Sequence, residues 1–481
     1  MIKHYLAFDL GAESGRAILG RFDAGLLTLQ ELRRFPNEPV RTGGSLHWDV
    51  QRLWLEMQRA LDESLPRLDS IGVDTWGVDY ALIGENGSLL ENPYHYRDCR
   101  TDGIMDTVLE KVSRERIYSI TGVQFMQINT LYQLFAACRS SPRLIEAADA
   151  VVTIPDLLNY WLTGNLCPEY TNATTTQLVD ARSRVWSAEL IEELGLPLRL
   201  FRPLVEPGTR IGTLLGKETP VIAPACHDTG SAVASISMSR ESAFLSSGTW
   251  SLLGAEMPAP VITPKARDLN FTNEGGVCGT VRVLKNIAGL WLLQSCRRCW
   301  KEGFSYGELL AAANDPRNAF RSIVDPDHSS FLHPENMVDA IADYCRNTGQ
   351  PVPADPPGCT RAILESLALK YRSVLESLEE ITGIHFQEIR IVGGGSRNRL
   401  LNQFTADATG RPVVAGPVEA TALGNIAMQM LATGAVGSLQ EARAVIDRSF
   451  PTERFEPLSA DRWDAPYRRF QEYSRDCSME R

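Results

Sequence analysis

The sequence has no long apolar run. Its most apolar short stretch, Ile287 to Leu293, is far shorter than the roughly 20 residues that a membrane-spanning helix needs. The N-terminal residues lead directly into a strand-like pattern and lack the charged and apolar regions of a signal peptide. We therefore expect a cytoplasmic protein with no membrane partner.

Positive charge is also in short supply. The chain has 48 Lys and Arg against 59 Asp and Glu, a net charge of −11. This balance argues against broad nucleic-acid binding, which needs a basic face. It does not exclude an anionic nucleotide, which backbone N–H groups and a metal ion can hold. With 481 residues, 44% hydrophobic and 22% charged, the chain is expected to form a globular protein of two or three domains.

The ten cysteines are scattered and give no disulfide framework of the secreted type. Cys296 and Cys299 form a C-x-x-C pair inside a helical pattern, which favours a structural role over zinc. Cys345 and Cys359 bracket a proline-rich stretch and could pair, although the sequence cannot decide this.

Two common nucleotide-binding signatures are absent. Residues 212–218 resemble a P-loop, but the spacing is one residue short and Glu218 stands where a Ser or Thr would hold Mg²⁺. No G-x-G-x-x-G follows a strand, so the dinucleotide fold lacks its signature. Any nucleotide site must therefore be built in another way.

The central stretch His227-Asp228-Thr229 is the first candidate site. It follows the strand-like Val221-Ile222-Ala223 and precedes a helix start rich in small residues. A carboxylate at such a turn is exposed and kept anionic by the helix N-terminus, which suits a general base. The alternative is that Asp228 only caps the helix.

Residues 5–20 predict a β-hairpin with a glycine-rich turn. Gly11 and Gly15 let backbone N–H groups face a phosphate, and Ser14 and Arg16 add donors. Asp9, at the end of the first strand, could hold Mg²⁺ directly or through water. The alternative is an ordinary hairpin with a surface salt bridge.

Residues 243–254 repeat this strand, polar glycine turn and strand about half a chain later. Two copies of one phosphate-type hairpin predict two similar domains that face a shared cleft.

Two further turns contain glycine. Residues 71–83 predict strand, turn and strand, in which Trp76-Gly77 could offer a flat ring and an open backbone to a sugar. The alternative is a core tryptophan beside a turn glycine. Residues 388–398 predict a strand, three glycines and a helix start, where a planar base or sugar could approach the backbone closely.

Three helices are predicted in the second half of the chain. Residues 284–300 are interpreted as an apolar helix, in which Asn286 and Gln294 either bind other protein groups or meet a ligand. A long amphipathic helix is expected from about Arg361 to Thr382, ending at Gly383. A surface helix is expected within residues 459–481.

Taken together, these motifs make the chain similar to the FGGY carbohydrate kinases, within the superfamily of actin, sugar kinases and heat-shock ATPases. The resemblance spans nearly the whole length and depends on six motifs in a fixed order: residues 9–16, 74–79, 227–229, 247–251, 271–276 and 391–395.

The resemblance implies an α/β fold of two actin-like (ribonuclease H-like) domains with an ATP and sugar cleft between them. The expected division is an N-terminal sugar domain at 1–238, a C-terminal nucleotide domain at 239–450 and a helical tail at 451–481.

The resemblance also implies ATP-dependent phosphorylation of L-rhamnulose at O1, with ATP and Mg²⁺ bound. Asp228 would be the catalytic base, and Asp9 would lie on the Mg²⁺ side. The sugar would contact Gly77, His227, Asp228, Thr229 and Asn286. ATP would contact Ala12, Glu13, Ser14, Gly15, Arg16, Thr249, Gln294 and Gly394, with the Glu13 side chain pointing away.

Other functions stay open at this point. L-fuculose or xylulose could be the acceptor, or the chain could be an actin-like ATPase switch that phosphorylates no small molecule. We expect a monomer or weak homodimer.

Overall fold

The computed structural model describes residues 2–64, 67–300, 303–332 and 334–476. The chain divides into two compact units, which are described here one at a time. Unit 1 comprises Met1–Ser237, Glu256–Val283 and Ala420–Phe450, and unit 2 comprises Met238–Ala255, Leu284–Glu419 and Pro451–Arg481. Within the described residues, no helix combines the length and the hydropathy needed to cross a bilayer.

Unit 1 is built on a six-stranded sheet in the order β11-β12-β6-β1-β2-β3. The central strands β1, β6 and β12 are parallel, and β2, β3 and β11 are antiparallel to their neighbours. The strand bounds are β1 Lys3–Leu10, β2 Ser14–Asp23, β3 Leu26–Pro36, β6 Ser70–Thr75, β11 Thr209–Thr213 and β12 Pro220–Ala223. The hairpin predicted for residues 5–20 is therefore confirmed.

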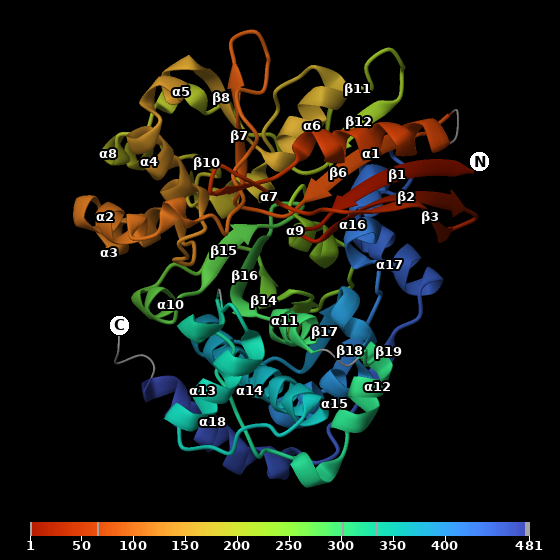
Figure 1. The fold of residues 1–481 in the computed structure, drawn as a ribbon. Helices are drawn as coiled ribbons and strands as arrows, with labels where there is room; N and C mark the ends of the chain where they lie inside the picture. Colours follow the sequence, from red (N-terminus) through yellow and green to blue (C-terminus); the bar gives the residue numbers. More distant parts are fainter. Residues whose placement is uncertain (1, 65–66, 301–302, 333, 477–481) are drawn as a thin grey trace. The chain divides into compact units, whose positions relative to one another are not determined.

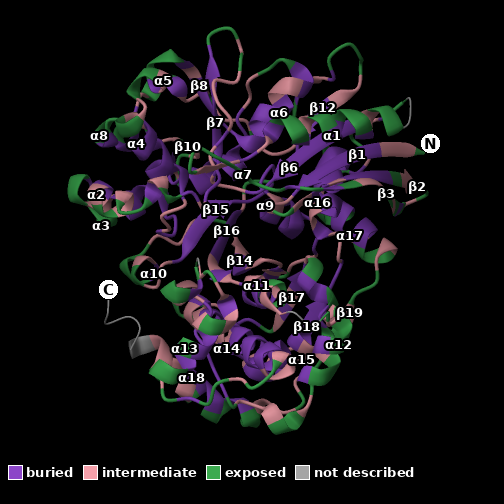
Figure 2. Ribbon diagram, in the orientation of Figure 1, coloured by how far each residue is buried: buried purple, intermediate pink, exposed green. Residues whose placement is uncertain are grey.

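Strand β1 is apolar on both faces because helices cover both sides of the sheet. Leu6, Phe8 and Leu10 pack in one core with α1 (Val50–Glu63) and α6 (Ile154–Thr163). Tyr5 and Ala7 face the other way, into a core with α16 (Ala420–Ala432) and α17 (Leu439–Ser449). This alternation is the two-residue period of a strand. Figure 1 shows α16 and α17 beside the sheet, and Figure 2 shows β1 and β6 as buried.

The remaining helices and strands of unit 1 lie outside the six-stranded sheet. The helices are α2 Ile104–Lys111, α3 Arg114–Thr121, α4 Thr130–Ser140, α5 Pro142–Ala147, α7 Tyr170–Ala173, α8 Ala188–Leu194, α9 Asp228–Ala234 and α10 Pro264–Asp268. The strands are β4 Val40–Thr42, β5 Ser45–His47, β7 Tyr80–Gly84, β8 Ala148–Thr153, β9 Val179–Asp180, β10 Val185–Trp186 and β15 Thr272–Gly275.

The second sheet has seven strands in the order β15-β16-β14-β13-β17-β18-β19. Its hairpin β13–β14 is antiparallel, β13, β17 and β18 are parallel, and β19 closes the edge antiparallel. The first sheet has the same pattern. Its hairpin β1–β2 is antiparallel, β1, β6 and β12 are parallel, and β11 closes the edge antiparallel. The duplicated fold predicted from two similar hairpins is thus confirmed. The bounds are β13 Ser242–Ser247, β14 Trp250–Met257, β16 Val281–Ala288, β17 Glu388–Val392, β18 Val413–Ala415 and β19 Glu453–Phe455.

The longest helix, α14 (Pro356–Thr382), packs in unit 2. It ends at Gly383, whose φ of 68° suits a glycine C-cap, as predicted. It begins five residues earlier than the expected Arg361, because Asp355 caps it and prolines are tolerated in its first turn. The other helices of the unit are α11 Trp291–Cys299, α12 Tyr306–Ala313, α13 Met337–Asn347, α15 Arg399–Thr409 and α18 Asp464–Asp476.

The single helix expected at residues 284–300 is wrong. Strand β16 ends at Ala288, and helix α11 begins only at Trp291. Gly289 separates them at a close contact, because a Cβ there would lie 2.6 Å from Ser251 Oγ. Asn286 therefore lies on a strand, whereas Gln294 does lie on a helix.

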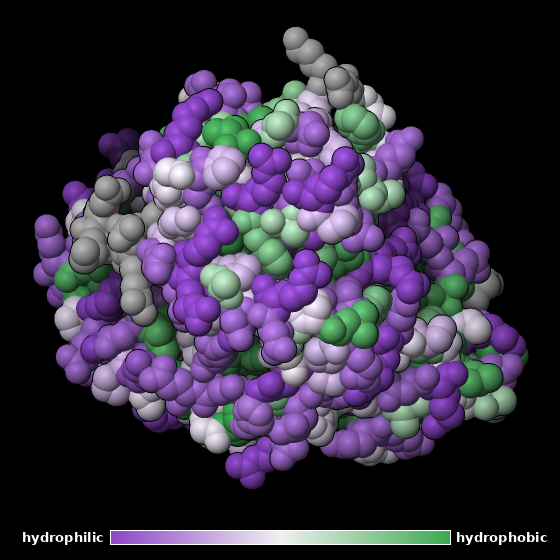
Figure 3. Space-filling model, turned by 90° about the horizontal axis from the view of Figure 1, so that it is seen from below, coloured by the Kyte–Doolittle hydropathy of each residue, from purple (hydrophilic) through white to green (hydrophobic). Residues whose placement is uncertain are grey.

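Cys345 and Cys359 are both free thiols, so the pairing that the sequence left open is not formed. Cys359 Sγ instead lies 4.0 Å from Cys296 Sγ. On the face in Figure 3, hydrophobic side chains form small separate groups among hydrophilic ones.

Candidate functional site

In unit 1, the first candidate group lies where parallel strands end. Asp9 of β1 is the register partner of Asp74 of β6, and Thr75 forms a bridge with His227. The carboxyl ends of β1 and β6 and the start of α9 therefore meet, as polar groups do at the strand ends of open α/β sheets.

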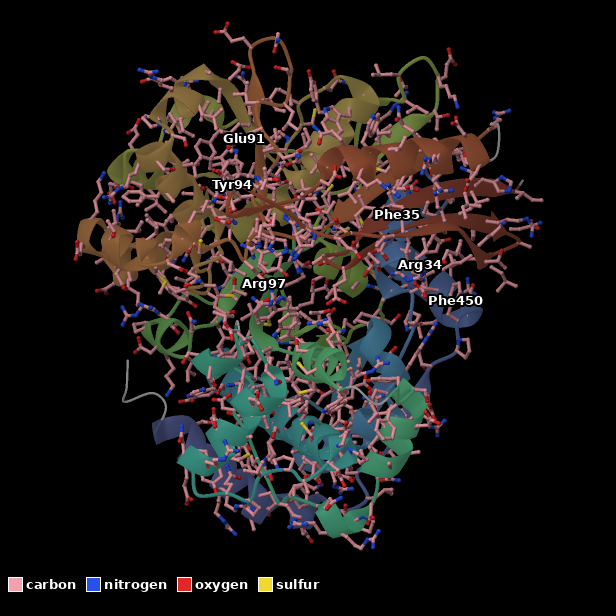
Figure 4. All side chains as sticks on the ribbon, viewed as in Figure 1. Arg34, Phe35, Glu91, Tyr94, Arg97 and Phe450 are labelled. Carbon is pink, nitrogen blue, oxygen red and sulfur yellow. The ribbon has the colours of Figure 1, made fainter. Side chains whose placement is uncertain are left out.

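The hairpin turn between β1 and β2 has a fixed backbone. Gly11 N–H donates to the Ser14 carbonyl (2.9 Å), and the Asn37 side chain donates to the Gly11 carbonyl (2.9 Å). The Glu13 side chain is exposed. Phe35, labelled in Figure 4, packs on Gly15, where a Cβ would lie 2.2 Å from the ring. Glycine at position 15 is therefore dictated by packing.

Arg16 is ion-paired with Asp9 across the hairpin. The sequence interpretation allowed a salt bridge or a Mg²⁺-side carboxylate at this position. The pair is only partly exposed, at 18% for Arg16 and 7% for Asp9. The two charges are held at the turn where a phosphate was predicted.

Asp74 is a site residue that the sequence interpretation missed. Its Oδ2 accepts a 2.6 Å hydrogen bond from Asn425 of α16, and its buried Oδ1 has no hydrogen-bond partner among the described residues. Burial and then the neighbouring Asp9 carboxylate raise the pKa of Asp74 well above its ordinary value. One signal was present, since both Asp9 and Asp74 end an apolar strand just before a glycine-containing turn.

The Asp9 and Asp74 carboxylates are the candidate ligands for the predicted Mg²⁺. Among the described residues, no three His, Cys, Asp or Glu side chains converge as a ready metal site. Mg²⁺ commonly uses only one or two carboxylates together with water and substrate phosphates. Asp9 and the unsatisfied oxygen of Asp74 supply donors of that kind, so the residues fit a Mg²⁺ bound together with a nucleotide.

Asp228 is the first residue of α9, and its side chain is 30% exposed. Its Oδ1 accepts from Thr229 N–H (2.5 Å) and Thr229 Oγ1 (3.1 Å), and lies 3.4 Å from His227 Nε2. All these contacts fall on one oxygen, and among the described residues nothing donates a hydrogen bond to Oδ2. The N-cap of α9 is His227, so Asp228 is the first helical residue rather than the cap, and its role as a base stays a prediction.

The sugar-type turn after β6 is tightly packed. A Cβ on Gly77 would lie 2.8 Å from the Thr175 side chain. Val78 has φ of +66°, a strained conformation for a β-branched residue. Thr175 Oγ1 accepts from Val78 N–H (2.9 Å), and Thr130 Oγ1 donates to the Val78 carbonyl (2.6 Å). Buried hydroxyls thus hold a strained turn, as found at many functional sites.

Trp76 belongs to the core. It is 5% exposed, its ring lies 4.2 Å from that of Trp48, and its Nε1 donates to Asp79 (2.9 Å). Burial raises the pKa of Asp79 to about 6. Tyr94, labelled in Figure 4, packs against the guanidinium of Arg100 at 3.8 Å. Of the two interpretations of Trp76-Gly77, the structure favours the core tryptophan.

Unit 2 gathers its own candidate residues at the end of β13. The carbonyl of Thr249, in the β13–β14 turn, accepts from the N–H groups of Gly289 and Trp291 (both 3.1 Å). This joins the turn to the start of α11, which carries Gln294. The Gln294 Oε1 is buried and has no hydrogen-bond partner among the described residues. Such an oxygen requires a donor.

The three glycines after β17 differ in what surrounds them. A Cβ on Gly393 would lie 2.9 Å from the Ser247 carbonyl, and one on Gly395 would lie 2.0 Å from Ser247 Oγ. Gly394 meets nothing within 4 Å. Two glycines therefore let the loop pack on the end of β13, and the third faces open space beside it.

The predicted residues thus fall into two sets. Unit 1 brings Asp9, the hairpin turn, Gly77 and residues 227–229 to the ends of its strands, and unit 2 brings Thr249, Gly394 and the α11 start together. Asn286 lies on β16 and has other polar interactions.

The sequence matches two family models. The N-terminal domain model of the FGGY family of carbohydrate kinases matches residues 4–228, and the C-terminal domain model matches residues 243–433. A rhamnulokinase of Bacteroides thetaiotaomicron is 47% identical over 482 residues, covering 98% of this chain and 99% of its own length. A rhamnulokinase of Oceanobacillus iheyensis is 44% identical, with 92% and 96% covered.

Solved structures show the same fold at low identity. A ligand-bound xylulose kinase from Lactobacillus acidophilus superposes with a TM-score of 0.82 at 16% identity, covering 99% of this chain and 98% of its own. A glycerol kinase from Plasmodium falciparum with ADP has a TM-score of 0.75 at 16% identity, with the same coverage.

Proposed function

Because the chain belongs to the FGGY family of carbohydrate kinases, we propose that it transfers the γ-phosphoryl group of ATP to O1 of L-rhamnulose. The substrate follows from the relatives named rhamnulokinase, which match nearly the whole chain at 44–47% identity. The observation that carries the chemistry is the Asp228 carboxylate, whose Oδ1 accepts from Thr229 while no described residue donates to its Oδ2.

In this proposal the acceptor sugar lies at Asp228. Its hydroxyls contact Gly77, Thr229 and Asn286, and Asp228 Oδ2 faces O1. His227 lies beside Asp228, with Nε2 3.4 Å from Asp228 Oδ1. The strained turn at Val78 is held by hydrogen bonds with Thr175 and Thr130, which suits a site that distinguishes one ketose from its epimers through a few hydrogen bonds.

ATP is bound by backbone and amide groups. The N–H groups of the Ala12–Arg16 turn and of Thr249 hold phosphate oxygens. Gly394 leaves room for the nucleotide, because a Cβ there would meet no atom of the described residues within 4 Å apart from its chain neighbours. Gln294 Oε1, which is buried and has no hydrogen-bond partner among the described residues, accepts a hydrogen bond from the nucleotide.

Mg²⁺ bound at Asp9, with Asp74 beside it, would offset charge on the phosphate oxygens. The Arg16 guanidinium adds positive charge at the same turn. The protein's share of the work is therefore positioning and charge stabilisation, as is typical of phosphoryl transfer.

In the reaction step, sugar O1 forms a bond to Pγ as the bond from Pγ to the β,γ-bridging oxygen breaks. The O1 proton passes to Asp228 Oδ2, and the bond electrons leave with ADP. The products are L-rhamnulose 1-phosphate, ADP and one proton, which Asp228 returns to solvent. Asp228 needs no unusual proton affinity, because the hydroxyl becomes acidic only late in transfer.

A coupled assay of ADP release over a ketose panel tests the substrate. We expect the highest kcat/KM with L-rhamnulose and a phosphomonoester on C1 by ³¹P NMR. A higher kcat/KM with L-fuculose or xylulose would show that this ketose, and not L-rhamnulose, is the acceptor. If no sugar changed the rate of ADP release, the protein would be an ATPase switch and not a sugar kinase.

Asp228→Asn tests the base. Asn keeps the acceptor oxygen for Thr229 N–H but cannot take the sugar proton. We expect kcat to fall about 10²-fold or more, with the KM for ATP and the melting temperature nearly unchanged. A folded variant with near-normal turnover would show that Asp228 is not the base.

A further inference from the structure

A buried arginine lies behind the proposed base, and none of the assignments above uses it. Arg282 of β16 is fully buried, with 0% of its surface exposed. Its Nη1 lies 3.2 Å from Glu274 Oε2 on β15, and its Nε donates to the Gly275 carbonyl (2.9 Å). A fully buried guanidinium is costly unless its charge has a defined use or partner.

The remaining nitrogen of Arg282 points at the imidazole. Nη2 lies 3.2 Å from His227 Nδ1, and the opposite ring nitrogen, Nε2, lies 3.4 Å from Asp228 Oδ1. All four residues belong to unit 1. The contacts form a chain from Glu274 through Arg282 and His227 to the carboxylate that takes the sugar proton.

This order of contacts fixes the position of the imidazole proton. A guanidinium only donates hydrogen bonds, so Nδ1 must accept and the ring hydrogen must be on Nε2. Glu274 Oε2 lies 3.3 Å from Nδ1, and as a hydrogen-bond acceptor it would by itself favour a proton on Nδ1 instead of Nε2. Arg282 counters this effect, because it neutralises Glu274 and has the better hydrogen-bond geometry toward Nδ1.

We propose that Arg282 is a positioning residue for phosphoryl transfer, which holds His227 neutral and turns its Nε2–H toward Asp228. His227 then donates to Oδ1, together with Thr229, and leaves Oδ2 for the sugar proton. The proposal rests on the role of Asp228 given above.

Without Arg282, the Glu274 carboxylate would face His227 uncompensated. The imidazole would then move its proton to Nδ1 or become an imidazolium. In the first case the Nε2 lone pair faces the Asp228 carboxylate and repels it. In the second case the imidazolium forms an ion pair with that carboxylate and lowers its affinity for the sugar proton. Both outcomes weaken the base without touching ATP.

The matched control is Arg443 of α17, another buried arginine of the same unit. It is 5% exposed, pairs with Glu256 (3.1 Å) and donates to the Ala234 and Val233 carbonyls at the far end of α9. Arg443→Met removes a comparable buried charge that contacts the far end of α9, and it leaves His227 untouched.

The first measurement is the His227 tautomer in the wild-type protein, from ¹⁵N side-chain shifts of histidine-labelled protein. The resonance is assigned by its loss in His227→Gln. We expect a protonated Nε2 and an unprotonated Nδ1. The opposite tautomer would overturn the proposal whether or not any Arg282 variant folds.

The second measurement is kinetic. We expect Arg282→Met to change the His227 shifts and lower kcat about 10- to 100-fold, the usual cost of removing a group that orients a functional histidine. The KM for ATP should stay within about twofold, and Arg282→Lys should recover part of kcat. Arg443→Met should lower the melting temperature but not kcat.

Normal kcat in Arg282→Met, or an equal kcat loss in folded Arg443→Met, would refute the proposal. Asp228→Asn, assayed in parallel, distinguishes a failure of the base assignment for Asp228 from a failure of the positioning role for Arg282. If Asp228→Asn is active, the base assignment fails. If Asp228→Asn is inactive and Arg282→Met is normal, only the positioning role fails.

Discussion

Substitution of Gly394 by valine separates nucleotide binding from folding at the triple glycine. Within the part of the chain that the structure describes, a Cβ placed there would meet nothing within 4 Å beyond its chain neighbours, and the backbone is not left-handed. We therefore expect the free energy of unfolding to change by no more than about 0.5 kcal/mol, as for an unconstrained surface position. The new side chain would instead occupy the space that we assign to ATP.

The size of the effect follows from overpacking. Forcing a bound nucleotide against two added methyl groups should cost about 1–3 kcal/mol, as overpacking does in protein cores. This corresponds to a rise of roughly 5- to 150-fold in the KM for ATP, taken as an affinity. The KM for the ketose should stay within about twofold, because the acceptor residues lie on other elements.

Gly395 provides the control. A Cβ there would lie 2.0 Å from Ser247 Oγ and 2.6 Å from Ser247 Cβ, so Gly395→Ala should destabilise the fold by about 1–3 kcal/mol. Both variants are compared by thermal unfolding and by initial rates with one substrate varied at a time. If Gly394→Val raised the KM of the ketose more than that of ATP, or left both unchanged, Gly394 would not line the nucleotide site.

Two further predictions concern the sugar-type turn. Thr175→Val removes the hydroxyl that accepts from Val78 N–H. This variant should lose about 1–3 kcal/mol of stability, and its KM for the ketose should rise more than its KM for ATP. Equal effects on both KM values would contradict a sugar role for the turn. Asp79 has its pKa raised from 3.8 to about 6, mainly by burial, so the folded state holds a proton that the unfolded state releases. Its stabilising contribution is complete below about pH 4 and is lost as the pH rises through 6. The melting temperature of wild type relative to Asp79→Asn should therefore fall between pH 4 and pH 7, and a difference that does not vary with pH would count against the shift.

Local pattern was enough to predict the hairpins and the turns. Strands such as the one that contains residues 5–8 have an apolar run, and Gly11 and Gly383 end elements in a way that backbone geometry dictates. The repeat of the first hairpin at residues 243–254 also revealed the duplicated fold, because similar local sequences form similar local structures. The helix expected at 284–300 was wrong, since a short apolar run has no period that separates a strand from a helix.

What the sequence by itself determined was therefore the duplicated α/β fold, the glycine turns and the Asp228 helix start. Only the tertiary structure decided which side chains act on one another. Asp74 joins Asp9 through parallel strand register across 65 residues, and Arg282 reaches His227 across 55 residues. Gly394 differs from Gly393 and Gly395 in what lies opposite it. Burial, orphaned oxygens and the direction of a proton depend on neighbours that are distant in the chain, and no local pattern records them.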